Sequence, residues 1–589
     1  MPRPVKTAPL NKSIQVEPEA EVEPATAEES VEETAEEPVE AVADETATEP
    51  EPDEAVADET DESAVDEPDA EQEPEPSDGA DEKAGQEPDE AGAGKAAEAA
   101  ASVPRWGRVR NITAGVLVGL VSLAVVVGLG ILFAVDLLPA KYLAPAVVAD
   151  LALAGVTGVL LLRSKKTMRR VRFAVAVALS VVMVAANGFV AKIGSDYISF
   201  TTNIQAGPTD TVQYDIVVPV AASDDPKALA GQPLGETASD PNQDAIDEQL
   251  GNLIGGVTPV FEPDWSSTIS ALVAGDVPAI VIDDGFLEIY SEIEPADYAG
   301  LKIVAQFVVP GKSSVRPDAT FTPPPVVVPP GADLPFIVYL SGIDTKGDIS
   351  KRSRSDMNQL MVVNPQTGKV LLVNTPRDYY VRLAGTTGLK DKLTHAGIYG
   401  IDTSVGTMAN LYGIDINYWV RVNFTSVTEI VDAVGGVDVY SDIAFTTSSG
   451  RFPIVQGMNH LDGAQALAFA RERYHVSGGD NTRGKNQQLV IEAILQKVTQ
   501  PSVLVNYTSI LNAVQGAIQT SMPEDAISAQ VKLQLKNNTA WSVETYSVTG
   551  SDSYEYTYSA SKQKLYVMIP NQASIDTAKQ KIAAILAGQ

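Results

Sequence analysis

Cysteine is absent from the 589-residue sequence, so no disulfide, thiolate metal site or cysteine nucleophile can form. Histidine is scarce, and His395, His460 and His475 lack the spacing of metal ligands, so we interpret all three as structural. No GxSxG or Walker motif occurs, which excludes the usual serine-hydrolase and P-loop sites. The sequence also has no excess of basic residues, so we expect no nucleic-acid partner.

The negative charge is concentrated at the N-terminus. Of a formal net charge of -36, residues 1–104 carry -29, with 34 acidic and 5 basic residues. This stretch has almost no aromatic residues and cannot bury enough apolar surface to offset chain entropy. We predict a disordered acidic tail. A solvated, self-repelling tail is the simpler interpretation, and docking to a basic partner is the alternative.

Three long apolar runs follow, at residues 113–135, 143–162 and 173–191. About 20 helical residues cross a bilayer core, so each run is long enough to span it. We therefore predict a three-helix transmembrane anchor at 105–195. We expect Asp150, inside the second run, to face another helix or to lie nearer the interface.

Basic residues predict how these spans are oriented. Arginines precede the first span, and the segment RSKKTMRRVR lies between the second and third spans. Basic flanks favour the cytoplasmic side. An odd number of spans then places the N-terminus in the cytoplasm and everything after about residue 195 outside the cell.

Two further domains are expected outside the membrane. Residues 196–320 read as a small α/β accessory domain, in which the sequence indicates no catalytic cluster. Residues 321–332 are a proline-rich linker. Residues 333–589 alternate strand and helix signals, which predicts a three-layer α-β-α domain with a mixed sheet.

Charged residues follow the predicted strands of this last domain. Asp344 lies in SGIDT, Asp356 in SRSDM, and Arg377 and Asp378 in TPRD. Open α/β sheets bind ligands beyond the carboxyl ends of their strands. Asp344 and Arg377 fall at such ends and are candidate site residues.

The segment FARERYHVSGGDNTRGKNQQ holds a second charged cluster. Arg471 and Arg473 would diverge on a helix but share a face in an extended segment, so we expect a helix to end near Arg471. Asp480 is the predicted N-cap of the next helix. Arg483 and Gln487, four apart, share a face of that helix near its positive end, where phosphate binds well.

The charged residues of these two clusters, together with Arg354, suit a diphosphate with a bridging metal. Arginine forks match phosphate oxygens, and carboxylates suit Mg²⁺. The chemistry indicated is phosphoryl transfer, in which positioning and charge neutralisation dominate. The simpler interpretation of each arginine alone is a surface ion pair.

Eight motifs in order give a resemblance. In chain order these motifs are SGIDT, SRSDMNQLMVVN, TPRDYYV, KLTHAGIYG, INYWVRVNFTSV, VDAVGGVDVY, HLDGAQALAFARERY and GDNTRGKNQQ. In all eight the chain resembles the LytR–CpsA–Psr (LCP) family. The resemblance covers about residues 334–589. The accessory domain and three-span anchor resemble its capsular-polysaccharide (CpsA-like) members.

The resemblance implies a function. LCP proteins attach polyprenyl-diphosphate-linked glycopolymers, such as capsular polysaccharide or teichoic acid, to peptidoglycan through a phosphodiester. It implies that Asp344 and Asp356 bind Mg²⁺, with Mn²⁺ as the alternative, and that the lipid enters an apolar groove. It further implies that the diphosphate is held by Arg377, Arg471, Arg473 and Arg483, supported by Arg354, with Asp480 and Gln487 as further polar residues. Many members have arginine where this chain has Lys485.

The mechanism implied is attack of an acceptor hydroxyl on the sugar-side phosphorus, with Asp378 or Asp480 taking the proton. The setting implied is the membrane of a Gram-positive-type bacterium, with other envelope-assembly proteins as further candidate partners. A non-catalytic regulator of envelope assembly and a hydrolase of the same lipid are the alternatives. The predicted outward topology disfavours a transcriptional attenuator.

Overall fold

The protein is described from a computed structural model, which describes residues 105–163, 169–205, 210–238, 240–311, 331–345, 348–477, 479–500, 503, 510 and 516–589. The predicted acidic tail at 1–104 and nearly all of the predicted proline-rich linker lie outside these residues. The boundaries predicted for the five parts of the chain stay predictions.

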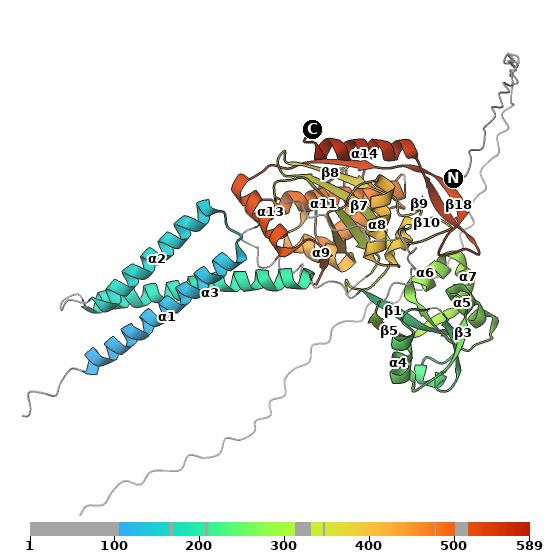
Figure 1. The fold of residues 1–589 in the computed structure, drawn as a ribbon, viewed down its shortest axis with the longest axis horizontal. Coiled ribbons are helices and arrows are strands. Elements are labelled where there is room, and N and C mark those ends of the chain that lie inside the picture. The colour runs from blue at the N-terminus through green and yellow to red at the C-terminus, as the bar shows by residue number, and fades with distance from the viewer. Residues whose placement is uncertain are drawn as a thin grey trace, which may run out of the picture. The chain divides into compact units, whose positions relative to one another are not determined.

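Within the described residues, three helices are long and apolar enough to cross a membrane: α1 (Arg105–Val135), α2 (Ala140–Leu162) and α3 (Arg169–Gln205). They pair with one another, as the blue-to-teal helices of Figure 1 show. Asp150 of α2 accepts a hydrogen bond of 3.0 Å from the side-chain amide of Asn187 on α3. The expectation that Asp150 faces another helix is therefore confirmed.

The next unit is the predicted small α/β domain, here called the accessory domain. Its sheet has the order β3-β2-β4-β1-β5, in which β2 is parallel to β3 and β4, and β1 is antiparallel to β4 and β5. Apolar residues of β1 alternate between the two faces, so α4 covers one face and α5 and α6 cover the other. In chain order its elements are β1 (Thr211–Pro219), η1 (Pro226–Leu229), β2 (Pro233–Thr237), α4 (Gln243–Ile254), β3 (Thr258–Glu262), α5 (Trp265–Ala274), β4 (Ile280–Asp283), α6 (Asp284–Ile293), α7 (Pro295–Tyr298) and β5 (Leu301–Pro310).

The C-terminal domain is built on a six-stranded mixed sheet of order β16-β11-β6-β7-β8-β17. Strands β6, β7 and β8 form an antiparallel meander, while β11 is parallel to β6 and β17 is parallel to β8. The elements up to the sheet's fourth strand are β6 (Phe336–Ile343), β7 (Ser355–Asn364), β8 (Lys369–Asn374), β9 (Tyr380–Val381), β10 (Asp391–Lys392), η2 (Leu393–Gly397), α8 (Ile401–Tyr412) and β11 (Tyr418–Val422).

The rest of this domain adds helices to both faces and strands to both edges of the sheet. Its elements are α9 (Phe424–Ala433), β12 (Val437–Ser441), β13 (Phe445–Thr446), β14 (Pro453–Ile454), β15 (Gly457–Leu461), α10 (Gly463–Arg471), α11 (Asp480–Val498), β16 (Ile518–Thr520), α13 (Glu524–Asn537), β17 (Ser542–Ser547), β18 (Gly550–Tyr556), β19 (Lys564–Pro570) and α14 (Gln572–Leu586).

Side chains that alternate between the two faces of the sheet produce three layers. Ile337 and Tyr339 of β6 face a core completed by α8 and α14, whereas Phe336 and Val338 face the opposite core against α11 and α13. Figure 1 shows α14 lying along the sheet beside β8. A strand whose alternate residues are both apolar must be covered on both faces. The predicted three-layer α-β-α class with a mixed sheet is confirmed.

Candidate functional site

One edge of the six-stranded sheet gathers the predicted site residues. Strands β6 and β8 run the same way and β7 runs opposite, so the ends of β6 and β8 meet the start of β7. Asp344 directly follows β6, Asp356 is the second residue of β7, and Arg377 lies three residues after β8. The expectation that Asp344 and Arg377 lie at carboxyl ends of strands is confirmed.

The loop between α10 and α11 supplies two more arginines. Helix α10 ends at Arg471, as the spacing predicts. The next residue, Glu472, is buried, and its carboxylate accepts hydrogen bonds from the backbone N–H groups of Arg473 and His475 and from Ser448. Burial would raise the pKa of Glu472, but the backbone N–H donors lower it to about 2. An ionised glutamate therefore holds this loop in place.

Helix α11 contributes Arg483 and Gln487, one turn apart, to the same site. The prediction that Asp480 is the N-cap is wrong by one residue. Gly479 occupies that position with a φ of 52°, and Asp480 is the first helical residue. Glycine adopts a positive φ without steric cost, which allows the chain to turn into the helix there. The side chain of Asp480 lies outside the described part of the structure.

A pocket of about 510 Å³, here called the polar pocket, brings the remaining predicted residues together. Among the described residues, six cationic and four acidic side chains line it, which is an excess of positive charge. Arg377 and Arg483 are buried in it, while Arg471 and Arg473 are exposed at its surface. The residues that line the polar pocket are Glu292, Asp344, Arg354, Asp356, Arg377, Asp378, Lys392, Phe424, Arg471, Arg473, Tyr474, Arg483, Gln487 and Tyr566.

Aromatic rings support the two exposed arginines. The guanidinium of Arg471 lies over the ring of Phe424, 3.9 Å from its centroid, and that of Arg473 lies over Tyr474 at 4.9 Å. Neither arginine has an ion pair with a carboxylate among the residues that the structure describes. Stacking holds both guanidinium groups in place without an acid, and Arg473 also donates a hydrogen bond of 2.7 Å to the Tyr474 hydroxyl. Cations held in this way suit an anionic ligand.

The two aspartates differ in electrostatic environment. Asp356 accepts hydrogen bonds from Arg377 at 2.6 Å and from Thr394 at 3.0 Å. Burial would raise the pKa of Asp356, but Arg377, Arg483 and Arg354 lower it. The pKa of Asp344 is raised, first by burial and then by the negative charge of Asp356. Asp356 is thus held ionised, and its charge opposes ionisation of Asp344.

This pair of carboxylates fits a divalent cation. Two aspartates close enough to raise a pKa by mutual repulsion gain stability when a cation lies between them, and Mg²⁺ prefers oxygen ligands together with substrate phosphates. The described residues contain no group of three or more His, Asp or Glu arranged as a metal site. Substrate oxygens or water would therefore have to complete the coordination.

The accessory domain also contributes to the polar pocket, which the sequence did not indicate. Glu292 of α6 forms ion pairs with Arg354, with Arg377 at 3.5 Å and with Lys392 at 3.0 Å. Burial would raise the pKa of Glu292, but Lys392, Arg354 and Arg377 lower it to about 2. Lys392, in the motif KLTHAGIYG, was also missed. Glu292 has no recognisable local signal, since it lies on an ordinary amphipathic helix.

Three further sequence expectations concern residues outside the pocket. Lys485 forms an exposed ion pair of 2.6 Å with Asp442 and does not line the polar pocket. His395 is buried and lies 2.7 Å from the Asp391 carboxylate, which supports its structural interpretation. His460 is paired at the surface with Asp438.

An apolar groove adjoins the polar pocket. It has a volume of about 150 Å³ and shares Asp356, Phe424, Arg471 and Gln487 with the polar pocket. Aliphatic side chains from β11, α9, α10 and α11 form its walls, among them Val420, Val427, Leu467, Val490, Ile491 and Ile494. A charged pocket that continues into an apolar groove suits a ligand with an anionic head and a hydrocarbon tail.

Residues 313–581 match the family model described as the LytR_cpsA_psr family. This part of the chain belongs to the LytR–CpsA–Psr family. The resemblance inferred from eight motifs is confirmed, and all the predicted site residues lie within the matched range. The assignment of the chain to the capsular-polysaccharide subtype stays a prediction.

Relatives of this LytR–CpsA–Psr domain are named polyisoprenyl-teichoic acid–peptidoglycan teichoic acid transferase TagU. The chain is 37% identical to that of Bacillus anthracis over 192 residues, which is 32% of this chain and 62% of the relative. It is 39% identical to that of Enterococcus faecalis over 193 residues, or 32% of this chain and 63% of the relative. The chain thus spans less than two thirds of the length of either relative.

Solved structures similar to the chain include two of the Tag proteins. B. subtilis TagV has a TM-score of 0.37 and 27% identity, and the similarity covers 43% of this chain and 98% of TagV. A structure described as TagT bound to LIIa-WTA has a TM-score of 0.35 and 26% identity, covering 47% of this chain and 97% of that one.

Proposed function

We propose that this protein transfers a polyprenyl-diphosphate-linked glycopolymer, a capsular polysaccharide or a teichoic-acid-like polymer, to peptidoglycan. The observation that carries the proposal is the arginine-rich polar pocket continuing into an apolar groove. The charged pocket matches a diphosphate, and the groove matches the adjacent isoprenoid carbons. The names of the TagU relatives support the same class of donor and acceptor.

The proposed roles follow the geometry. Arg377 and Arg483, which are buried, hold the diphosphate at the base of the pocket, and Arg471 and Arg473 contact it from the exposed side. The acceptor hydroxyl oxygen bonds to the sugar-side phosphorus. The bond from that phosphorus to the bridging oxygen breaks, and polyprenyl phosphate leaves with the electron pair. Arginines that neutralise the departing phosphate lower the barrier to this step.

The proton of the acceptor hydroxyl needs a carboxylate base. Asp378 lines the polar pocket, and its carboxylate lies 3.4 Å from the Lys392 ammonium and 3.8 Å from the Arg377 guanidinium. Asp480 is the second candidate. Asp344 and Asp356 would hold Mg²⁺, or Mn²⁺ in its place, which when bound would neutralise charge on the phosphate oxygens.

The membrane anchor suits a lipid-linked donor. We propose that the N-terminus is cytoplasmic and that the accessory and C-terminal domains lie outside a Gram-positive-type cell membrane. The three apolar helices and the basic segment between the second and third support this topology. The anchor would keep the site close to the bilayer that holds the polyprenyl chain.

An in vitro transfer assay tests the proposal. Full-length protein in lipid nanodiscs is incubated with Mg²⁺, a short polyprenyl-diphosphate glycan and a peptidoglycan oligomer. A covalent glycan–peptidoglycan product is expected. Arg377→Ala and Asp356→Ala should each reduce its formation at least a hundredfold while the thermal unfolding profile stays cooperative. Lys485→Ala is the matched control, because this cation lies outside the polar pocket, and it should leave the rate within twofold.

The alternatives predict different products. Lipid cleavage without acceptor would identify a hydrolase. Saturable lipid binding with no turnover would identify a non-catalytic regulator. Normal transfer by a folded Arg377→Ala protein would refute the proposed role of the polar pocket.

A further inference from the structure

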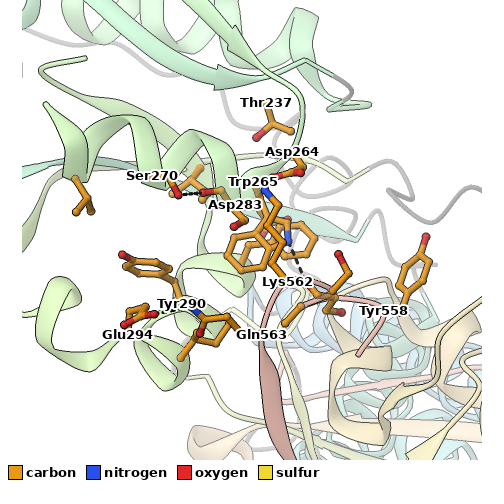
Figure 2. A pocket seen from close by; sticks show the side chains of 18 of the residues that line it. Thr237, Asp264, Trp265, Ser270, Asp283, Tyr290, Glu294, Tyr558, Lys562 and Gln563 are labelled. Carbon is orange, nitrogen blue, oxygen red and sulfur yellow. Dashed lines mark hydrogen bonds and ion pairs between the residues drawn. The ribbon is translucent and has the colours of Figure 1, made fainter. Parts of the chain in front are cut away.

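A second cleft, larger than the polar pocket, lies where the accessory domain meets the C-terminal domain, and Figure 2 shows it from close by. Its volume is about 650 Å³. Helices α5 and α6 of the accessory domain form one wall, and the turn between β18 and β19 forms the other. We call it the aromatic cleft, because Trp265, Phe286, Tyr290, Tyr399 and Tyr558 line it.

The aromatic side chains form a continuous series across the two domains. Trp265 stacks on Phe286 with ring centroids 5.6 Å apart, and Phe286 meets Tyr399 edge-on at 6.2 Å. Tyr399 in turn meets Tyr558 edge-on at 5.9 Å. The indole N–H of Trp265 donates to the Ser559 carbonyl across the boundary. The rings are therefore fixed in place before any ligand arrives, which limits the entropy lost on binding.

The charged groups that line the cleft are mostly acidic. Of the described residues that line it, five are acids and one, Lys562, is a cation. The acids are Asp240, Asp264, Asp283, Glu294 and Asp297. This charge pattern is opposite to that of the polar pocket and disfavours a phosphate or carboxylate ligand.

Most of these carboxylates already accept hydrogen bonds within the protein. Asp264 is paired with Lys562 at 3.1 Å, and Glu294 accepts from Gln563 at 2.5 Å. Burial raises the pKa of Asp283 to about 8. The cleft therefore offers oriented hydrogen-bond acceptors more than a free negative charge, which favours a hydroxyl-rich ligand over a basic peptide.

Helix α6 separates the two cavities. Phe286, Tyr290 and Ile293 line the aromatic cleft, whereas Glu288 and Glu292 contact Arg354 beside the polar pocket. Spacings of three and four residues place each set on its own face of one helix. A helix with its side chains is about 10–12 Å across, so a ligand in the cleft lies about one helix diameter from a diphosphate in the pocket.

We propose that the aromatic cleft binds a saccharide segment free of phosphate and carboxylate groups. The flat C–H face of a sugar ring packs on aromatic rings, while its hydroxyl groups donate to the carboxylates around them. This inference rests on the proposed transfer function, because it assigns to the cleft a neutral glycan stretch of one of the two polymers. The acidic lining favours the acceptor over a phosphate-bearing donor polymer.

Binding by the full-length protein in nanodiscs tests this proposal with three probes: chitohexaose, a glycerol-phosphate hexamer and hexalysine. Saturable binding of chitohexaose alone is expected. Val273→Trp should weaken it at least tenfold, because Val273 is 44% exposed and lines the cleft. Val220→Trp is the matched control, since Val220 is an exposed valine of the same domain outside the cleft, and it should change nothing.

The outcomes separate this inference from the proposed function. Arg377→Ala should keep chitohexaose affinity while losing transfer. Absence of chitohexaose binding, equal binding by Val273→Trp, or preference for either charged hexamer would overturn the saccharide assignment. Transfer activity in the assay above would stand in each of those cases.

Discussion

Removing the charge of Glu292 should strengthen diphosphate binding. This carboxylate lies on α6 of the accessory domain and forms ion pairs with Arg354, Arg377 and Lys392 in the polar pocket. A diphosphate that binds Arg377 and Lys392 must share those cations with Glu292. The substitution Glu292→Gln keeps the size of the side chain and removes only the competing negative charge.

The expected gain in binding free energy follows from one distance. The Glu292 carboxylate lies 3.5 Å from the Arg377 guanidinium. A phosphate oxygen on the same guanidinium would lie about 2.8 Å further on, so the two anions are about 6 Å apart. At an effective dielectric of about 20, unit charges at that distance repel by about 2.8 kcal/mol. Screening by salt, and looser positioning of the arginines without Glu292, reduce the net gain to about 1.4 kcal/mol, or about tenfold.

Isothermal titration calorimetry with farnesyl diphosphate measures this effect. Glu292→Gln should bind about tenfold more tightly than the wild-type protein. Glu294→Gln is the matched control, because Glu294 follows the same helix but accepts a hydrogen bond from Gln563 on the side of the aromatic cleft. Its affinity should stay within twofold of wild type.

Weaker binding by a folded Glu292→Gln protein would refute this reasoning. It would mean that Glu292 is needed to orient the arginines and that its repulsion of the ligand is the smaller effect. If Glu294→Gln increased the affinity for the diphosphate equally, the cause would be a general change in the protein's electrostatic potential and not competition inside the polar pocket.

Three further predictions concern the supports of the site. Glu472→Gln should lower the transfer rate at least tenfold and reduce the melting temperature, because the neutral amide accepts weaker hydrogen bonds from the loop between α10 and α11; thermal unfolding and the transfer assay measure both. Gly397→Ala should lower the unfolding free energy by more than about 2 kcal/mol, because a Cβ at this position would meet the Ser353 carbonyl oxygen. Gly251→Ala should instead raise the unfolding free energy by about 0.5–1 kcal/mol, because Gly251 lies on a helix and a Cβ there would meet open space. The folded-state pKa of Glu292, about 2, is below its unfolded value of about 4.5, so its stabilising contribution is present above about pH 4.5 and is lost as pH falls toward 2. Acid unfolding of Glu292→Gln should accordingly depend less on pH in that window than unfolding of the wild-type protein.

Local patterns predicted much of the C-terminal domain. The apolar run FIVYL belongs to β6, which is covered on both faces, and the spacing of Arg471 and Arg473 located the end of α10 to the residue. Strand ends near Asp344 and Arg377 located the site, because the carboxyl ends of parallel strands share one edge of a sheet.

Other parts of the site could not be predicted from local patterns. Glu292 reaches Lys392 across 100 positions of sequence, and nothing in its own helix marks that contact. The N-cap of α11 was misplaced because the positive φ of Gly479 decides where the helix begins, and a sequence of two glycines and an aspartate permits either start. The aromatic cleft was missed for a related reason: its rings come from two domains and only together form a surface.

The order of strands in the C-terminal sheet also constrains how this domain is made. Strands β6, β7, β8 and β11 form its interior, but both edges, β16 and β17, come from residues 518–547. Until those residues are synthesised, the interior strands β8 and β11 each present an unpaired edge, which is a template for association with other chains. The sheet therefore closes late, through contacts distant in sequence, and such topologies fold slowly. We expect a chain truncated before residue 518 to aggregate instead of forming a smaller stable domain.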